Sequence, residues 1–117
     1  HSNDFVMLDV SDTPVGCEIE KLHKTVLSHH VFHPNELDAL SNLPSGDIQN
    51  HEFLRLWTAK EAFLKAIGTG IDAKASSYDF SKSNTISLDD GSFWKLEHHT
   101  VYDFPDYLSC VCYKCLQ

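Results

Sequence analysis

An acidic segment near the start of the sequence has the residue types of a metal site. Residues 15–20 read VGCEIE, which we interpret as a β-strand. Because residues two apart on a strand face the same way, Glu18 and Glu20 should present two carboxylates on one surface, while Cys17 and Ile19 face the other. Carboxylate oxygens are ligands that Mg²⁺ prefers.

A second segment adds a third acid and two ammonium groups. Residues 57–70 read WTAKEAFLKAIGTG, which predicts a helix closed by glycine. Trp57, Glu61 and Lys65 recur every four residues, so a helix carries them on one stripe, where the acid and the ammonium can share a ligand. Lys60 lies about 100° away around the same helix. Together with the acidic strand, this stripe suits a magnesium-bound pyrophosphate.

Each pattern also has an ordinary structural interpretation. A glutamate and a lysine four residues apart on a helix are most often a solvated surface pair, and two acids on a strand usually face water. The joint order of both segments in one chain favours a functional site.

The elements that must position these residues predict an α+β fold. Residues 5–10 form an apolar run with β character, and a turn composition at residues 11–14 joins it to the acidic strand as a hairpin. A proline-initiated helix is predicted over residues 34–40. A longer helix is predicted over residues 47–67, with a buried stripe made of Phe53, Leu56, Phe63 and Ile67.

Short strands are predicted after the long helix, which Gly68 should end. Four strand-like pieces follow, separated by turn signals such as Asp89-Asp90-Gly91. They cover residues 78–80, 85–88, 93–102 and 107–113.

Composition limits the class of protein. The 117 residues, 42% of them hydrophobic, suffice for one core, and we expect residues 1–117 to form a single domain. A formal charge of −8 argues against nucleic acid or an anionic membrane as the main partner. Since the sequence shows neither a long apolar run nor a signal pattern, we expect no membrane association and a cytoplasmic location.

The cysteines favour a structural role over a zinc site. Cys110, Cys112 and Cys115 crowd the end of the chain, where the first two would share one face of a strand as small apolar groups. A fourth ligand is not obvious, and the eight histidines lack the spacing of a zinc protease. We therefore expect structural thiols and no structural zinc.

The two chemical segments resemble the signature motifs of the 4'-phosphopantetheinyl transferases. The first matches G-x-[DE]-x-E at residues 16–20, and the second matches W-x-x-K-E-x-x-x-K-x-x-G-x-G at residues 57–70. Two further pieces resemble the surfactin-synthetase-activating class of this superfamily. His1-Ser2 resembles the end of its Ser-His-Ser segment, and FHPNE at residues 32–36 is similar to its Phe-Ser-x-x-Glu segment. The resemblance covers nearly the whole chain.

The resemblance implies a fold and an assembly. It implies a 4'-phosphopantetheinyl transferase-like half, with an antiparallel sheet packed against one long helix and shorter helices. Members of the surfactin-synthetase-activating class hold two such halves with the active site at their junction. The resemblance implies that this chain corresponds to the second half, and we expect the first half to be absent. The smaller holo-acyl-carrier-protein synthases have one such unit and form trimers. We therefore expect a homo-oligomer or pairing with a missing N-terminal half.

The resemblance also implies an activity. Such enzymes move the 4'-phosphopantetheine arm from coenzyme A to a serine of an acyl or peptidyl carrier protein in fatty-acid, polyketide or peptide pathways. The reaction depends on Mg²⁺ and releases 3',5'-ADP. By motif position, Glu18 and Glu61 would ligate the metal directly, and Glu20 would bind the metal or its water. Glu61, or a metal-bound water, would take the serine proton.

The remaining site residues would bind coenzyme A, again by motif position. Lys65 would hold the pyrophosphate and act in catalysis, and Lys60 would contact the 3'-phosphate or the pantetheine. His1 would lie near a phosphate.

Two features keep other functions open. The class normally has aspartate where this chain has Glu18, whose longer side chain would shift or loosen the metal. A charge of −8 should also repel coenzyme A and acidic carrier proteins at long range, unless basic residues cluster or another subunit supplies them. The alternatives are a catalytically inactive half-domain or accessory subunit that binds carrier protein or coenzyme A, and a plain carrier-protein or nucleotide-binding module.

Overall fold

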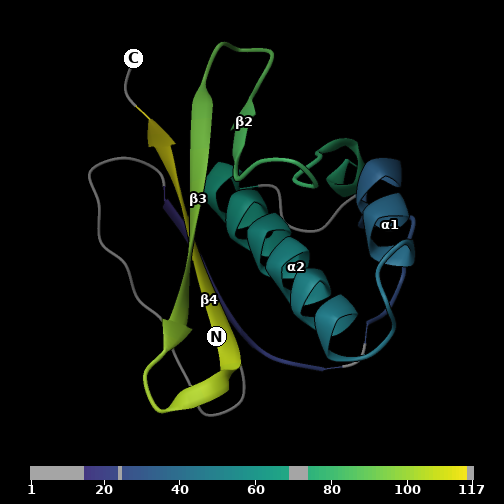
Figure 1. Ribbon diagram of the computed structural model, residues 1–117. Helices are drawn as coiled ribbons and strands as arrows, with labels where there is room; N and C mark the ends of the chain where they lie inside the picture. Colours follow the sequence, from purple (N-terminus) through teal and green to yellow (C-terminus); the bar gives the residue numbers. More distant parts are fainter. Residues whose placement is uncertain (1–14, 24, 69–73, 116–117) are drawn as a thin grey trace.

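The protein consists of one antiparallel sheet and two helices, as the computed structural model shows for residues 15–23, 25–68 and 74–115 (Figure 1). The sheet has four strands in the order β1-β4-β3-β2. The elements in chain order are β1 (Val15–Lys21), α1 (Pro34–Ser41), α2 (Asp47–Ile67), the short 3₁₀ helix η1 (Ala75–Ser77), β2 (Thr85–Ser87), β3 (Phe93–Val101) and β4 (Phe104–Cys115). The predicted α+β class is confirmed.

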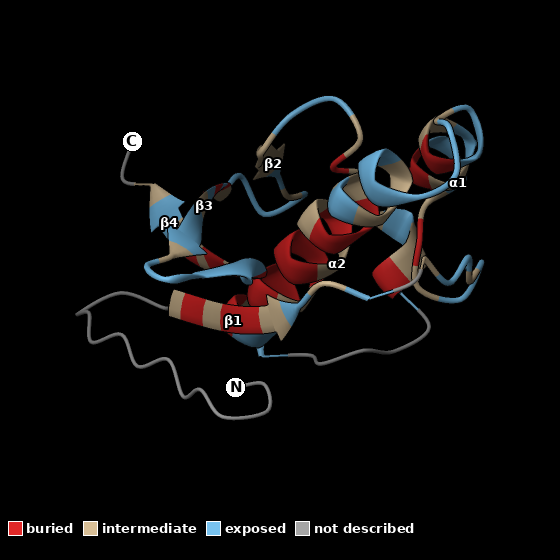
Figure 2. Ribbon diagram, turned by 60° about the horizontal axis from the view of Figure 1, so that its bottom comes forward, coloured by how far each residue is buried: buried red, intermediate tan, exposed pale blue. Residues whose placement is uncertain are grey.

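The core lies between α2 and one face of the sheet. In the register of β4, Cys110 faces Glu18 of β1 and Cys112 faces Leu96 of β3, so alternate residues of three strands point toward the helix. Figure 2 shows that α2 is mostly buried beyond its first turns, which are exposed, and that buried and intermediate residues alternate along much of β1. The side chains of Leu56 and Phe63 on α2 are fully buried there.

Both helices have the predicted positions, and local capping explains their ends. α2 occupies residues 47–67 as predicted, and Gly68 follows in the left-handed region at φ 82°, where its N–H donates to the carbonyl groups of Leu64 and Lys65. α1 begins at Pro34 and runs one residue beyond Leu40. Its first turn is held by a capping box between His33 and Glu36.

One predicted strand is wrong. Residues 78–80 do not join the sheet, because side chains of the helices take their backbone hydrogen bonds. The carbonyl oxygen of Tyr78 accepts from Lys60, the N–H of Phe80 donates to Glu36, and the carbonyl oxygen of Phe80 accepts from Arg55. η1, just before this segment, was not predicted.

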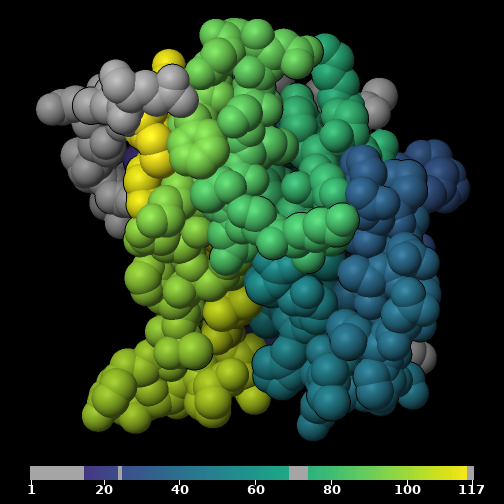
Figure 3. Space-filling model, turned by 45° about the horizontal axis from the view of Figure 1, so that its top comes forward, coloured from purple at the N-terminus to yellow at the C-terminus, as the bar shows by residue number. Residues whose placement is uncertain are grey.

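The other strands after α2 are confirmed with shifted ends. β2 and β3 match their predictions within a residue, whereas β4 is longer than predicted and pairs with β3 through a tight turn at Asp103, whose φ is 63°. This β3–β4 hairpin projects at one corner of the molecule (Figure 3). The predicted strand at residues 5–10 lies outside the described residues. Of the helices in the described part of the chain, none has the length and apolar character needed to cross a bilayer.

Candidate functional site

The acidic strand and the long helix approach each other unusually closely. A β-carbon added to Gly16 would lie 1.9 Å from the carbonyl oxygen of Ala62 and 2.6 Å from the backbone nitrogen of Ala66. Only glycine leaves room for this contact between the backbones of β1 and α2. The approach places Glu18, two residues later on the same face, against the helix stripe that carries Glu61 and Lys65.

Glu18 and Lys65 meet at this junction, a contact that the motif spacing did not predict. Glu18 is only 5% exposed, and its Oε1 accepts a hydrogen bond of 3.0 Å from the N–H of Ile19. The Lys65 Nζ lies 3.4 Å from Glu18 Oε2 and donates to the carbonyl oxygen of Cys17 at 3.3 Å. The Lys65 side chain is 44% exposed, so its ammonium can reach a ligand in solvent.

The negative charges of both strand acids, Glu18 and Glu20, affect the pKa of Glu61. Its pKa is raised, first by burial and then by the negative charge of Glu18, to which it is also hydrogen-bonded. Glu20 raises this pKa further, whereas the Lys65 ammonium opposes the rise. The charges of Glu18, Glu20 and Lys65 therefore all act on the pKa of Glu61. A cation bound among these carboxylates would relieve their repulsion.

This group is not a closed metal cage. Within residues 15–23, 25–68 and 74–115, no group of three or more His, Cys, Asp or Glu side chains is placed to hold a metal ion, and the predicted set of Glu18, Glu20 and Glu61 does not form such a group. Mg²⁺ does not require such a cage, because it commonly binds through one or two carboxylates together with substrate phosphates and water. The chemistry of the donor set, two strand carboxylates and one helix carboxylate beside an ammonium, fits that mode of binding.

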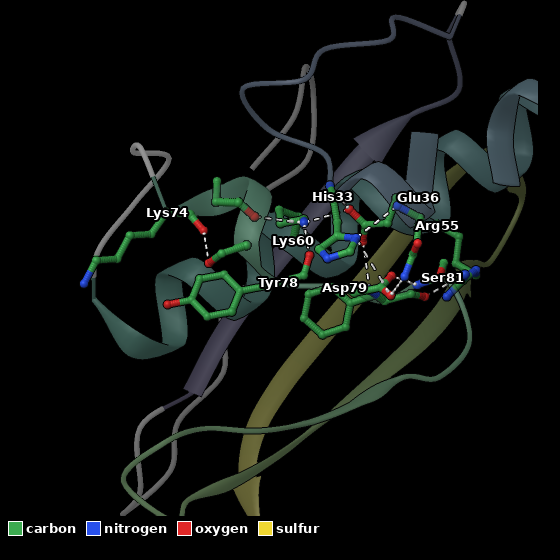
Figure 4. Close-up of polar contacts among 12 residues, drawn as sticks. His33, Glu36, Arg55, Lys60, Lys74, Tyr78, Asp79 and Ser81 are labelled. Atoms are coloured by element: carbon green, nitrogen blue, oxygen red, sulfur yellow. Dashed lines mark hydrogen bonds and ion pairs between the residues drawn. The ribbon is translucent and has the colours of Figure 1, made fainter. Parts of the chain in front are cut away.

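Lys60 has a different role from the predicted contact with coenzyme A. Its side chain is fully buried, and its Nζ donates to Glu36 Oε1 at 2.8 Å, to the carbonyl oxygen of Ala75 at 3.0 Å and to that of Tyr78 (Figure 4). Three acceptors use the three N–H bonds of an ammonium, so none remains for a ligand. Neighbouring residues of a helix are rotated by about 100° around its axis, so Lys60 points into the core while Glu61 lies on a different side of α2.

Glu36 is the partner of Lys60 in a buried ion pair. The sequence did not lead us to predict this role for Glu36. Besides Lys60, its carboxylate accepts hydrogen bonds of 2.9 Å from the backbone N–H groups of His33 and Phe80. Glu36 thereby links α1, α2 and the segment after η1 around one ion pair (Figure 4). Its position three residues after the N-cap His33 was the available signal, since a capping box places an acid there.

The other predicted residues fall outside this site. His1 lies outside the described residues. Cys110 and Cys112 are fully buried on one face of β4, which confirms the predicted packing. Burial raises the pKa of both thiols, that of Cys112 to about 12, so neither is a thiolate at neutral pH.

Comparisons with known proteins agree with the geometry. The profile of the 4'-phosphopantetheinyl transferase superfamily matches residues 14–112. The chain is 33% identical over 90 residues to the 4'-phosphopantetheinyl transferase gsp of Aneurinibacillus migulanus, which covers 75% of this chain and 38% of that protein. It is 30% identical to the 4'-phosphopantetheinyl transferase ffp of Bacillus subtilis, over 96% of this chain and 52% of that protein.

A relative of the smaller type is also similar. The holo-[acyl-carrier-protein] synthase of Limosilactobacillus reuteri strain DSM 20016 is 37% identical over 67 residues, which cover 53% of this chain and 55% of that protein. The chain thus spans about half or less of the length of these curated relatives. No solved structure matches it significantly. The profile match over most of the chain shows that it belongs to the 4'-phosphopantetheinyl transferase superfamily.

Proposed function

We propose that this protein transfers the 4'-phosphopantetheine group of coenzyme A to a serine of an acyl or peptidyl carrier protein, with Mg²⁺ as cofactor. The observation that carries the proposal is the junction of β1 and α2. There the buried Glu18 carboxylate, the coupled Glu61 carboxylate and the half-exposed Lys65 ammonium meet. Membership of the superfamily supports the class of reaction.

The three glutamates are the proposed metal ligands. Glu18 and Glu61 would hold Mg²⁺ directly, and Glu20 would bind it or one of its waters, with coordination positions left for the pyrophosphate of coenzyme A. The bound metal would neutralise negative charge that develops on the phosphate oxygens.

The chain's own residues position the reactants and move the proton. Lys65 binds the pyrophosphate, and Glu61 accepts the proton of the serine hydroxyl directly or through a water. The serine oxygen forms a bond to the phosphorus that carries the pantetheine. The bond from this phosphorus to the bridging oxygen breaks, and 3',5'-ADP leaves with the electron pair. Most of the rate enhancement then comes from placement and charge neutralisation.

A second subunit or a further half would complete the site. Lys65 contributes one positive charge, whereas coenzyme A carries several negative ones. The ammonium is also shared with Glu18 at 3.4 Å, which reduces what it offers a phosphate. Additional cations would therefore come from a second copy of the chain or from another half.

The alternative is a half-domain or accessory subunit that binds coenzyme A or a carrier protein without transfer. The contact between Lys65 and Glu18 favours it, because the ammonium already compensates one of the acids that a metal would bind. Binding without transfer would be its signature.

A transfer assay separates the two functions. Labelled coenzyme A is incubated with an apo carrier protein, with and without Mg²⁺, for the wild type and for Glu61→Ala. Transfer that needs Mg²⁺ and is lost in Glu61→Ala supports the proposal. Asp38→Ala, which removes an exposed acid of α1, is the matched control and should retain transfer. Retained transfer in Glu61→Ala would contradict the assigned role of Glu61.

A further inference from the structure

The two lysines of the long helix are held very differently. The Lys60 side chain is fully buried, and its Nζ donates to Glu36 Oε1 at 2.8 Å. The Lys65 side chain is 44% exposed, and its contacts with Glu18 Oε2 and with the Cys17 carbonyl oxygen are longer, at 3.4 and 3.3 Å. Hydrogen bonds from N–H to oxygen are normally about 2.7–3.2 Å long, so Lys65 is only loosely attached.

The carboxylate of Glu18 lies in a position where two cations would interfere. It is 5% exposed, its Oε1 accepts from the N–H of Ile19, and its Oε2 faces the Lys65 ammonium. A magnesium ion lies about 2.0–2.1 Å from an oxygen that ligates it. Such an ion and an ammonium beside the same buried carboxylate would repel each other, with little screening by solvent. A metal ion on Glu18 therefore favours the departure of Lys65.

The proposed metal ligands need a rearrangement in which Lys65 is the mobile charge. Among the residues that the structure describes, Glu18, Glu20 and Glu61 are not placed to hold a metal ion together, so side chains must move for one to bind. The Lys65 ammonium also opposes the rise in the pKa of Glu61, which shows that its charge acts on both proposed direct ligands. Movement of this one side chain changes the charge at Glu18 and Glu61 together.

We propose that Lys65 is an exchangeable counter-ion of Glu18, which leaves this carboxylate when a divalent cation binds there and then pairs with the pyrophosphate of coenzyme A. The exposed end of the side chain gives the ammonium room to move between the two anions. This inference rests on the proposed function, since it describes how the metal site and the coenzyme A site of that reaction are coupled.

The exchange makes the two ligands bind cooperatively. A metal ion alone competes with the Lys65 ammonium for Glu18, whereas coenzyme A draws the ammonium to its phosphates and leaves the carboxylate to the metal. Because such coupling is reciprocal, the metal should raise the affinity for coenzyme A by the same factor. The contact between Lys65 and Glu18 is then compatible with an active enzyme.

The test is Mn²⁺ binding in the absence of coenzyme A, followed by water-proton relaxation. Lys65→Met removes the competing ammonium and should bind Mn²⁺ about tenfold more tightly than the wild type, within the usual range of coupling between two sites. The matched control is Lys82→Met, because Lys82 is also exposed but lines a separate hollow with Arg55 and Ser83. The control should bind Mn²⁺ as the wild type does. Unchanged affinity in Lys65→Met, or an equal gain in both variants, would overturn the proposal.

Lys65→Arg tests the exchange from the opposite direction. Arginine keeps the positive charge and can bind a carboxylate through two N–H groups, so it should hold Glu18 at least as firmly as lysine does. The Mn²⁺ affinity without coenzyme A should therefore equal that of the wild type or fall below it. Tighter Mn²⁺ binding by Lys65→Arg would contradict the exchange, whether or not Lys65→Met is stable.

Thermal stability gives a second readout that does not depend on transfer. Without metal, Lys65→Met should melt below the wild type, because the buried Glu18 carboxylate loses the ammonium beside it. Added Mn²⁺ should then raise the Tm of Lys65→Met more than that of the wild type. Saturating coenzyme A should also raise the Mn²⁺ affinity of the wild type by a larger factor than that of Lys65→Met. Equal factors in the two proteins would show that Lys65 does not couple the two sites.

Failure of this inference can be told apart from failure of the proposed function. If the wild type transfers phosphopantetheine and Lys65→Met binds Mn²⁺ no more tightly than the wild type, the exchange is wrong, although the transferase remains. If Lys65→Met binds Mn²⁺ more tightly but the wild type never transfers, the exchange stands and the catalytic proposal fails.

Discussion

Gly16 and Ala62 bring the backbones of β1 and α2 so close together that a β-carbon on Gly16 would stand 1.9 Å from the Ala62 carbonyl oxygen. The added β-carbon would be fixed to the backbone of a strand, and the oxygen that it would meet belongs to the backbone of a helix. Neither group can rotate away as a flexible side chain could. The distance from Glu18 to Glu61 and Lys65 depends on this contact.

Gly16→Ala should therefore separate the strand from the helix. We expect a loss of about 3 kcal/mol or more in the free energy of unfolding, at the upper end of overpacking effects. Urea titration followed by circular dichroism measures it. Gly91→Asn is the control, since Gly91 has open space around it and asparagine tolerates its φ of 86°. A Gly16→Ala protein as stable as this control would contradict the close approach.

Glu61→Gln should stabilise the metal-free protein near neutral pH while abolishing transfer. The pKa of Glu61 is raised in the folded state by burial and by Glu18, so the folded protein binds more protons than the unfolded chain above the ordinary pKa of 4.5. The stability that Glu61 contributes is complete below that value and is lost as pH rises through the folded pKa. Glutamine removes this loss.

The measurement is the melting temperature of the wild type and Glu61→Gln across a pH series without metal. The advantage of the variant should grow as pH rises from about 4.5 toward neutrality. A constant difference between the two proteins across the series would show that Glu61 has no raised pKa.

The Lys60–Glu36 pair should behave as a structural element. Removing one member leaves an uncompensated buried charge, so Lys60→Met should cost about 3–5 kcal/mol of unfolding free energy, and so should Glu36→Gln through the buried ammonium. The double variant Lys60→Met/Glu36→Gln should recover part of this loss. A double-mutant cycle in urea measures the coupling.

This pair should not contribute to coenzyme A affinity directly. For Lys60→Met that is still folded, the dissociation constant for coenzyme A should match that of the wild type within a few-fold. A selective loss of coenzyme A binding without loss of stability would return Lys60 to the ligand role predicted from the motif.

The contrast between Lys60 and Lys65 shows how far the sequence could lead. The four-residue spacing of Trp57, Glu61 and Lys65 was enough to place one stripe of α2, and Gly68 was enough to end the helix. The spacing also put Lys60 on a different side, but it could not show that this side faces the core. That depends on Glu36 and on the carbonyl groups of Ala75 and Tyr78, which only the tertiary fold brings to it.

The same tertiary contacts explain the missed segment at residues 78–80. Its apolar and aromatic residues predicted a strand, but helix side chains satisfy its backbone groups, so the segment has no need of a strand partner. Local propensity carries no information about such distant hydrogen bonds.

His98 should make the fold sensitive to mild acid. Its ring is packed between β3 and α2, where Nε2 lies 3.0 Å from the Arg55 carbonyl oxygen, and burial is the main cause that lowers its pKa. The Nδ1 atom is buried and has no hydrogen-bond partner among the residues that the structure describes. Protonation would therefore add a donor at Nδ1 for which none of these residues provides an acceptor.

Because the unfolded chain binds this proton more readily, the stability that His98 contributes should fall as pH drops below its ordinary pKa of 6.5, down to the lowered folded value. Thermal melts at several pH values for the wild type and His98→Gln measure this. The loss of stability between pH 6.5 and the folded pKa should shrink in the variant. His99→Gln is the control, since the adjacent His99 side chain is 58% exposed. Identical pH profiles for all three proteins would rule out the effect.

The central claim is that Glu18 and Glu61, supported by Glu20, hold one divalent cation together with coenzyme A. The most direct test is to titrate Mn²⁺, as a paramagnetic replacement for Mg²⁺, into the protein with coenzyme A and to follow water-proton relaxation. One Mn²⁺ should bind per protein chain. The variants Glu18→Gln and Glu61→Gln should each lose most of the affinity for Mn²⁺, whereas the control Asp38→Asn should retain it. Equal Mn²⁺ binding by the wild type and both glutamate variants would contradict the account.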